Sequence, residues 1–238
     1  MAVYLISGVS RGIGRVLAEQ LAAAGHAIYG VARSPVPGLA LAGRIELQLR
    51  DFAAYAEALA PALAELPQRD GQPLLDGLVH CAGVVRPGRL ADQPAAEFSE
   101  QFDINVIAGA ELVRHCLPSL RAARGTVVLV NSGSGLDARP PLSSYGAAKF
   151  ALRGYAQALR QEEPRLRVST VYPGRTHTDM QRTVRAAESG EYRAEEYLRP
   201  ETVAGVIASV LTLPADAVIT DVTLRPAGQP GPSSPDSA

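Results

Sequence analysis

Apolar and polar positions change their period repeatedly along this chain. Short apolar runs predict strands at residues 3–7, 27–32, 44–49, 74–80, 126–131, 166–172 and 218–224. Longer amphipathic stretches predict helices at about 12–24, 52–66, 94–122, 143–162 and 200–212. Several strands, such as Thr-Val-Val-Leu-Val-Asn at 126–131, are almost continuously apolar, as is typical of central parallel strands buried on both faces. The pattern therefore predicts an α/β fold around a mainly parallel sheet.

The same pattern predicts a single domain over residues 1–225. No long linker or internal repeat divides the chain. A polar stretch at 179–199, interrupted by Gly190, lies between the sixth strand and the last helix, and we expect it to act as a substrate lid. The segment 226–238 mixes Pro with Gly and Ser, so we expect it to be disordered.

The composition of the chain limits the classes of partner that it could bind. The 238 residues are 47% hydrophobic and 20% charged, which excludes a disordered or fibrous chain. Basic and acidic residues number 23 and 24, so the net charge of −1 predicts neither a nucleic-acid nor a membrane partner, and favours a small molecule. With two cysteines, no signal-peptide pattern and no apolar run near the roughly 20 residues of a membrane span, we expect a cytoplasmic protein.

Three glycines follow the first strand and open the first helix. Gly8, Gly12 and Gly14 have the spacing GxxxGxG, and the turn between them contains Ser10, Arg11 and Ile13. Glycine permits a tight turn and a close approach of backbone to a pyrophosphate, which the helix N-terminus then binds. The motif predicts a dinucleotide site, although a plain strand-to-helix turn would have the same glycines.

Lys149 is the only lysine, since the other 22 basic residues are arginines. Ammonium and guanidinium groups are not interchangeable, so a solitary lysine in this background suggests a specific role. Tyr145 lies four residues earlier and would share a helical face with it. We expect the cation to lower the pKa of the phenol toward a range useful for proton transfer. The alternative is a surface pair on a solvated helix.

GxxxGxG, YxxxK and a serine thirteen residues before the tyrosine together resemble the short-chain dehydrogenase/reductase (SDR) family, over about residues 3–225. The resemblance implies a catalytic set of Ser132, Tyr145, Lys149 and Asn105, in which Asn105 bends its helix and holds a relay water. Ser132 is chosen over Ser134 because Gly135 and Pro140 follow it at the family spacing. The implied fold is a three-layer, doubly wound Rossmann sheet of seven strands in the order 3-2-1-4-5-6-7.

Further matches imply cofactor contacts. The positions are Asp51 toward the adenine, Ala82 and Gly83 near the ribose, and Pro173, Gly174 and Thr178 near the nicotinamide. Asp51 would serve equally as a helix N-cap. His80 and Cys81 replace the family's usual Asn-Asn before Ala82, which puts the packing at this point in question. A metal site at His80-Cys81 or His115-Cys116 is not expected, because no ligand spacing supports it.

The end of the second strand predicts the cofactor. Ala32 and Arg33 stand where NAD-binding proteins carry a carboxylate, and Arg11 is a second cation for a 2′-phosphate, so we expect NADP(H) over NAD(H). The alternative is that both are ordinary surface arginines. The resemblance further implies hydride transfer between NADP(H) and a carbonyl or alcohol substrate, in a homodimer or homotetramer. A dinucleotide-sensing regulator and a sugar epimerase or dehydratase are the alternatives.

Overall fold

The computed structural model describes residues 1–227, and a seven-stranded sheet forms its centre. The strands are β1 (Val3–Ser7), β2 (Ala27–Ala32), β3 (Gly43–Glu46), β6 (Gly77–His80), β7 (Thr126–Val130), β8 (Arg167–Pro173) and β9 (Asp221–Leu224). They lie in the order β3-β2-β1-β6-β7-β8-β9, and all neighbouring pairs are parallel. Numbered in chain order within the sheet, this is 3-2-1-4-5-6-7, so the predicted doubly wound fold is confirmed.

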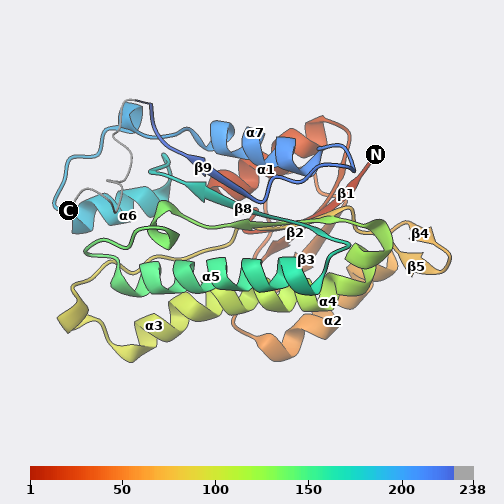
Figure 1. The fold of residues 1–238 in the computed structure, drawn as a ribbon, viewed down its shortest axis with the longest axis horizontal. Coiled ribbons are helices and arrows are strands. Elements are labelled where there is room, and N and C mark those ends of the chain that lie inside the picture. Colours follow the sequence, from red (N-terminus) through yellow and green to blue (C-terminus); the bar gives the residue numbers. More distant parts are fainter. Residues whose placement is uncertain (228–238) are drawn as a thin grey trace.

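Helices cover both faces of the sheet (Figure 1). On one face lie α1 (Gly12–Ala23) and α7 (Pro200–Leu211), and on the other α2 (Tyr55–Ala64), α3 (Ala95–Phe102), α4 (Ala108–Ala123) and α5 (Ser143–Glu162). Each face has its own apolar core, because β1 and β7 are buried along their whole length and send alternate side chains to opposite sides.

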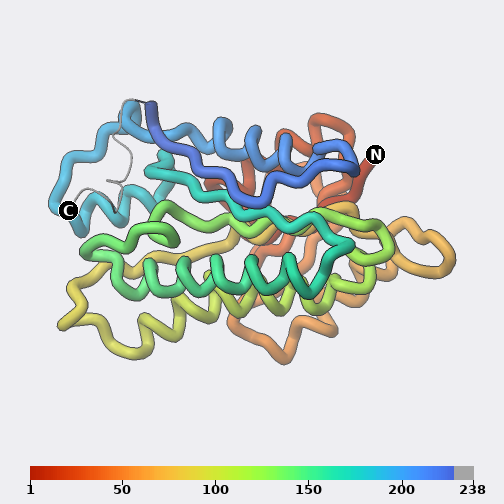
Figure 2. The backbone as a smooth tube through the Cα atoms, viewed as in Figure 1, coloured from red at the N-terminus to blue at the C-terminus, as the bar shows by residue number. Residues whose placement is uncertain are grey.

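Several elements differ from the pattern-based prediction. The helix expected at 94–122 is interrupted by one π-helical turn, η3 (Asp103–Ile107), between α3 and α4. A hairpin of β4 (Gln68–Arg69) and β5 (Gln72–Pro73) precedes β6 and projects from the end of the molecule opposite the segment 179–199 (Figure 2). Asp70 and Gly71 both have positive φ at its turn, so this Asp-Gly pair was a hairpin signal that the apolar pattern does not contain.

The segment predicted as a lid contains a helix that the sequence analysis did not predict. Helix α6 (Asp179–Ala187) begins directly after Thr178, and a short turn, η5 (Ala194–Glu196), follows it. Three other single turns are η1 (Phe52–Ala54), η2 (Leu90–Asp92) and η4 (Gly133–Gly135). Of the tail predicted to be disordered, Pro226 is buried and Ala227 exposed, and residues 228–238 lie outside the described part of the chain.

The parallel sheet places the turns after β1, β2, β6, β7 and β8 along one edge, where the glycine turn, the Ala82-Gly83 segment and Ser132 therefore meet. Within residues 1–227, no helix is both long and apolar enough to cross a membrane.

Candidate active site

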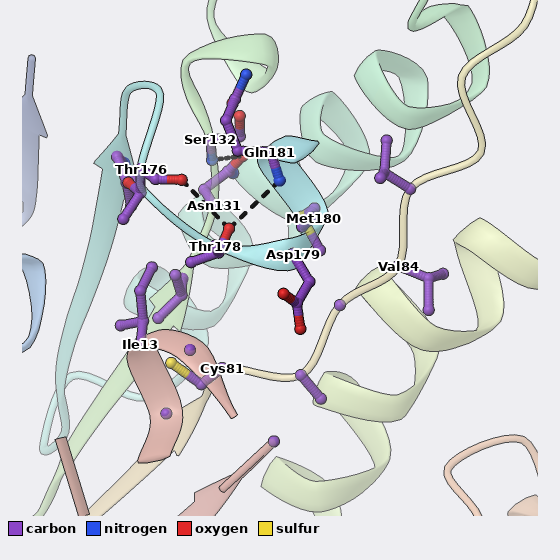
Figure 3. Close-up of a pocket in the computed structure, with 18 of the residues that line it drawn as sticks. Ile13, Cys81, Val84, Asn131, Ser132, Thr176, Thr178, Asp179, Met180 and Gln181 are labelled. Atoms are coloured by element: carbon purple, nitrogen blue, oxygen red, sulfur yellow. Dashed lines mark hydrogen bonds between the residues drawn. The ribbon is translucent and has the colours of Figure 1, made fainter. Parts of the chain in front are cut away.

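A cleft of about 1140 Å³ lies at this edge of the sheet. It collects most of the predicted site: Gly8, Ser10, Arg11, Gly12, Ile13, Gly14, Ala32, Arg33, Ala82, Gly83, Ser132, Tyr145, Lys149, Pro173, Gly174 and Thr178 all line it. Figure 3 draws part of this lining, with Ile13 and Cys81 near Thr178 and the start of α6. Two predicted residues, Asp51 and Asn105, are not among those that line the cleft.

The glycine turn is built by close backbone packing. Gly8 has φ +77°, and a Cβ on it would lie 2.8 Å from the Ala82 backbone. A Cβ on Gly14 would lie 2.5 Å from the Gly8 carbonyl oxygen. Both positions therefore require glycine for α1 to start this close to β1 and the segment after β6. Arg11 precedes α1 and makes no side-chain cap hydrogen bond, so no side chain occupies the first-turn N–H groups from that position.

His80 stands where the family usually has an asparagine, and its ring makes the hydrogen bonds at this point. The Ala82 N–H donates to Ser7 Oγ at 3.2 Å, and Ser7 Oγ lies 2.9 Å from His80 Nδ1. His80 Nε2 lies 3.1 Å from the Ile104 carbonyl oxygen, which can only accept, so Nε2 carries the proton and Nδ1 accepts from the serine hydroxyl. Burial lowers the pKa of His80 to about 3, so the ring is neutral. The hydrogen bonds of one buried imidazole thus link β1, the Ala82 segment and the π turn.

Asn105 lies behind the cleft, in the π turn. Its side chain is fully buried, its Oδ1 accepts from the Val84 N–H at 3.0 Å, and its Nδ2 donates to the Val84 carbonyl at 3.0 Å. Gly83 approaches so closely that a Cβ there would lie 2.9 Å from Asn105 Oδ1. The asparagine thus holds the chain segment that follows β6, and it does so from an irregular point in its helix.

Ser132 and Tyr145 line the end of the cleft that the resemblance predicts to be catalytic, which we call the catalytic end. Asn131 Oδ1 accepts from the Ser132 N–H at 2.8 Å, while Asn131 Nδ2 donates to the Lys149 carbonyl at 3.0 Å. Sequence reasoning missed Asn131, whose only signal was its place at the end of an apolar strand. The neighbouring Ser132 hydroxyl acts to lower the pKa of Tyr145.

The expected effect of Lys149 on Tyr145 was wrong for this structure. Burial dominates and raises the pKa of Tyr145 to about 12, because only 7% of the residue is exposed and the phenolate would lose its hydration. The Lys149 Nζ is 5.7 Å from the centroid of the Tyr145 ring and donates to the Val130 carbonyl at 2.9 Å. Burial lowers the pKa of Lys149 to about 8. The surface-pair alternative also fails, since Lys149 is only 3% exposed.

The end of the cleft near β2, which the resemblance predicts to hold the adenosine and which we call the adenosine end, carries exposed arginines. Arg33 is exposed and follows the buried Ala32 at the end of β2. Arg11 is also exposed and forms an ion pair with Asp179, with 3.4 Å between Nη1 and Oδ2. Asp51 is exposed outside the cleft, and it makes no side-chain cap hydrogen bond either. Gln48, three residues earlier, lines the cleft instead. After β3 the chain reaches the cleft at Gln48. It then leaves the cleft before the helical turn that begins after Asp51.

Thr178 caps the start of α6. Its Oγ1 accepts from the Gln181 N–H at 3.4 Å and donates to the Thr176 carbonyl at 3.2 Å, as Figure 3 shows. The preceding segment is held to the sheet by the Gly174 N–H, which donates to the Leu224 carbonyl at 2.8 Å. Thr178 therefore lines the cleft with its hydroxyl already engaged in starting the helix that the sequence analysis missed.

The cysteine and histidine pairs serve packing. Cys81 lines the cleft and Cys116 lies on the buried face of α4, and burial raises the pKa of both thiols to about 12. The ring of His80 is packed against Gly109. Among residues 1–227, no group of three or more His, Cys, Asp or Glu side chains is arranged to hold a metal ion.

A family profile described as short chain dehydrogenase matches residues 2–189. The chain belongs to this family. An uncharacterized short-chain type dehydrogenase/reductase of Sinorhizobium fredii is 29% identical over 236 residues, covering 95% of this chain and 92% of the relative. The benzil reductase ((S)-benzoin forming) of Saccharomyces cerevisiae is 29% identical over 240 residues, covering 88% and 89%.

Solved structures agree with this assignment. The alcohol dehydrogenase of the archaeon Thermococcus sibiricus, complexed with 5-hydroxy-NADP, aligns with a TM-score of 0.83 and 25% identity over 97% of this chain and 99% of that one. The family consists of oxidoreductases that use a nicotinamide dinucleotide on CH–OH or C=O groups. The cleft fits such a cofactor, because the glycine turn brings backbone and the start of α1 to its wall, where a phosphate would be bound.

Proposed function

We propose that this protein transfers a hydride between NADP(H) and a carbonyl or alcohol substrate, with Tyr145 as the proton donor and acceptor. One observation supports this most: Ser132, Tyr145 and Lys149 come from two elements and line one cleft together with the glycine turn. A nicotinamide dinucleotide, when bound, supplies or accepts the hydride.

Each side chain has a distinct task in this proposal. Tyr145, with its pKa raised to about 12, is protonated near neutral pH and so donates to the carbonyl oxygen during reduction. The Ser132 hydroxyl donates a hydrogen bond to the same oxygen and so holds the carbonyl next to Tyr145. Lys149 donates one of its three N–H groups to the Val130 carbonyl, which leaves two for ribose hydroxyls. Asn105 fixes the segment after β6 and, as the resemblance implies, holds a relay water.

The preference for NADP(H) rests on charge at the end of β2. Arg33 lines the cleft, and the described residues include no ion-pair partner for it. A carboxylate at this point would accept from a ribose 2′-hydroxyl and repel a 2′-phosphate, and Ala32 supplies none. A guanidinium bound to phosphate contributes about 1.5–3 kcal/mol as a charge-assisted hydrogen bond.

The direct test is cofactor consumption. The protein is mixed with NADPH or NADH and a panel of ketones and aldehydes, and loss of the reduced cofactor is followed. We expect kcat/KM with NADPH to exceed that with NADH by about 10², as about 3 kcal/mol would give. Equal efficiency would contradict the NADP(H) assignment. Tight cofactor binding without turnover of any substrate would favour a sensing regulator, and conversion of a sugar without net cofactor consumption would favour an epimerase.

We also propose a cytoplasmic homodimer or homotetramer that uses the outer faces of α4 and α5. Phe150 on α5 is 42% exposed, and both cysteines are free thiols, as in a reducing compartment. Size-exclusion chromatography with light scattering measures the state, and a monomer at assay concentration would contradict the oligomer.

A further inference from the structure

The residue that follows β7, Asn131, is a buried amide between two parts of the proposed catalytic set. Its Oδ1 accepts from the Ser132 N–H at 2.8 Å, and its Nδ2 donates to the main-chain carbonyl of Lys149 at 3.0 Å. Its own N–H donates to the Val171 carbonyl of β8 at 2.7 Å. Asn131 is only 4% exposed. The amide therefore connects the turn that carries Ser132 with the helix that carries Lys149.

Lys149 has a second contact with the end of β7. Its Nζ donates to the Val130 carbonyl at 2.9 Å, so two consecutive residues bind the ammonium group and the main chain of the same lysine. Tyr145 lies one helical turn earlier on α5. The Nζ contact does not involve the Asn131 amide, so it would still hold α5 against β7 if that amide were removed. The Ser132 N–H, in contrast, has Asn131 Oδ1 as its acceptor.

The hydroxyl of Ser132 is oriented by contacts on both sides of it. The residue is extended, with φ −163° and ψ 159°, and Ser132 Oγ accepts from the Ser134 N–H at 3.2 Å. A hydroxyl that accepts from a backbone N–H still has its own proton to donate. Ser132 can therefore donate to a ligand oxygen, and Asn131 fixes the main chain from which this hydroxyl projects (Figure 3).

The turn after Ser132 encloses the amide of Asn131. A Cβ on Gly135, in η4, would overlap Asn131 Oδ1 and would lie 3.0 Å from the Lys149 carbonyl oxygen. The φ of Gly135 is not positive, so this position requires glycine for space rather than for its backbone conformation. The backbone of η4 thus packs against the oxygen that binds the Ser132 N–H.

We infer that Asn131 is a positioning residue for the reaction: its amide sets the position of the Ser132 hydroxyl relative to Tyr145 and Lys149. This inference rests on the proposed function, and it adds a residue outside the four that the family resemblance implies. Asn131 acts through Ser132, because the oxygen and the nitrogen of its side chain are both bound to main chain. The alternative is an amide that only stabilises the end of β7.

A double-mutant cycle with Ser132 tests the inference. Asn131→Ala, Ser132→Ala and the double variant are compared in single-turnover kinetics with NADPH and the best substrate of the ketone and aldehyde panel. We expect Asn131→Ala to lower the rate by about 10- to 10²-fold, as a misplacement of about 1 Å can, while the Kd for NADPH stays within about threefold. In the Ser132→Ala background the same substitution should lower the rate less than about threefold, because no hydroxyl remains to be misplaced.

Gly135→Ala disturbs the same contact without removing the amide. The added Cβ should displace Asn131 Oδ1, so the rate should fall about tenfold, and again less than about threefold when Ser132 is replaced by alanine. Gly205→Ala, on α7, is the control for the added methyl group, because a Cβ there meets nothing within 4 Å. It should leave the rate within about twofold of wild type.

Ser169→Ala is the control for the loss of a buried hydrogen bond. Its hydroxyl donates to the Ile219 carbonyl at 2.6 Å, and Ser169 is not among the residues that line the cleft. The variant should lower the free energy of unfolding, as Asn131→Ala should, and yet keep the rate within about twofold of wild type.

The outcomes are distinguishable. Equal losses of rate with and without the Ser132 hydroxyl, or a loss below about threefold in Asn131→Ala, would overturn the inference and leave Asn131 as a support of the fold. If Asn131→Ala does not bind NADPH, the comparison with Gly135→Ala decides, and loss of NADPH binding in both variants would also overturn the inference.

Failure of the proposed function gives different results. An unchanged rate in Ser132→Ala would remove Ser132 from the mechanism, and this inference with it, while the protein remained an oxidoreductase. Binding of NADPH by the wild-type protein without turnover of any compound in the panel would contradict the proposed function before any variant is compared.

Discussion

The two ends of the cleft handle charge in opposite ways. At the catalytic end Tyr145, Lys149 and Asn105 are 7%, 3% and 0% exposed, and Lys149 and Asn105 are fixed by hydrogen bonds to backbone. At the adenosine end Arg11 and Arg33 are exposed, and the ion pair of Arg11 with Asp179 is long, at 3.4 Å. Burial gives the first end its shifted pKa values and exact placement. The cations of the second end stay hydrated, so we expect substitutions there to change cofactor affinity more than stability.

The largest effect is expected from Tyr145→Phe. The variant removes one proton and keeps a ring that packs against Val85 and Val184. General acid catalysis contributes about 10²–10⁴ in rate, so kcat should fall by that factor while the Kd for NADPH stays nearly constant. Single-turnover kinetics with a chemistry-limited substrate measure this. A variant that kept more than about a third of the wild-type rate would remove Tyr145 from the mechanism.

The next effect is on stability at the buried end. His80→Leu leaves the Ser7 hydroxyl and the Ile104 carbonyl without their partner. Each unpaired group costs about 1–3 kcal/mol, so the free energy of unfolding should fall by about 2–6 kcal/mol in urea denaturation. His80→Asn, which keeps a donor and an acceptor, should recover part of this loss. A decrease of less than about 1 kcal/mol in His80→Leu would show that the network contributes little.

At the exposed end, Arg33→Ala should lower kcat/KM with NADPH by about 10- to 10²-fold, because one charge-assisted contact is lost. The value with NADH should stay within about twofold, since that cofactor carries no 2′-phosphate. Arg44→Ala, at an exposed ion pair on β3 that does not line the cleft, is the control. An unchanged affinity for NADPH would mean that Arg33 is an ordinary surface arginine.

The pH dependence of amine labelling tests the buried environment of Lys149 at the catalytic end. Because burial lowers the pKa of Lys149 to about 8, its neutral amine is nearly complete above about pH 9, and the labelling rate should level off there. Bound NADPH should slow labelling about tenfold. Peptide mapping is unambiguous, since only Lys149 and the α-amino group react. A rate that kept rising tenfold per pH unit up to pH 10 would indicate an ordinary lysine.

The smallest effect is expected from Asp179→Asn. Exposed ion pairs contribute about 0.2–1 kcal/mol, so freeing Arg11 from Asp179 should tighten NADPH binding by about two- to fivefold without a measurable change in stability. Glu46→Gln, which frees Arg44 outside the cleft in the same way, is the control. Weaker NADPH binding in Asp179→Asn would show that Arg11 does not meet the 2′-phosphate.

Some of this site could be predicted because its signals are local. The glycine spacing depends on a turn of seven residues, and the Tyr145-Lys149 spacing depends on one helical turn. Other parts were missed because they depend on distant partners. Asp51 and Gln48 are three residues apart, and only the path of the chain after β3 decides which one lines the cleft. Helix α6 was missed because its stretch is polar overall, with apolar residues on one narrow face.

By itself the sequence determined the α/β class, the strand order through its family resemblance, and the residue types at the glycine turn and the Tyr145-Lys149 helix face. Only the tertiary structure decided their electrostatic state. The pKa of Tyr145 is raised because burial outweighs its neighbours. His80 is neutral because burial lowers its pKa, and its contacts with Ile104 and Ser7 fix its tautomer. Desolvation and hydrogen bonding depend on atoms that lie tens of residues apart along the chain, so spacing alone does not contain them.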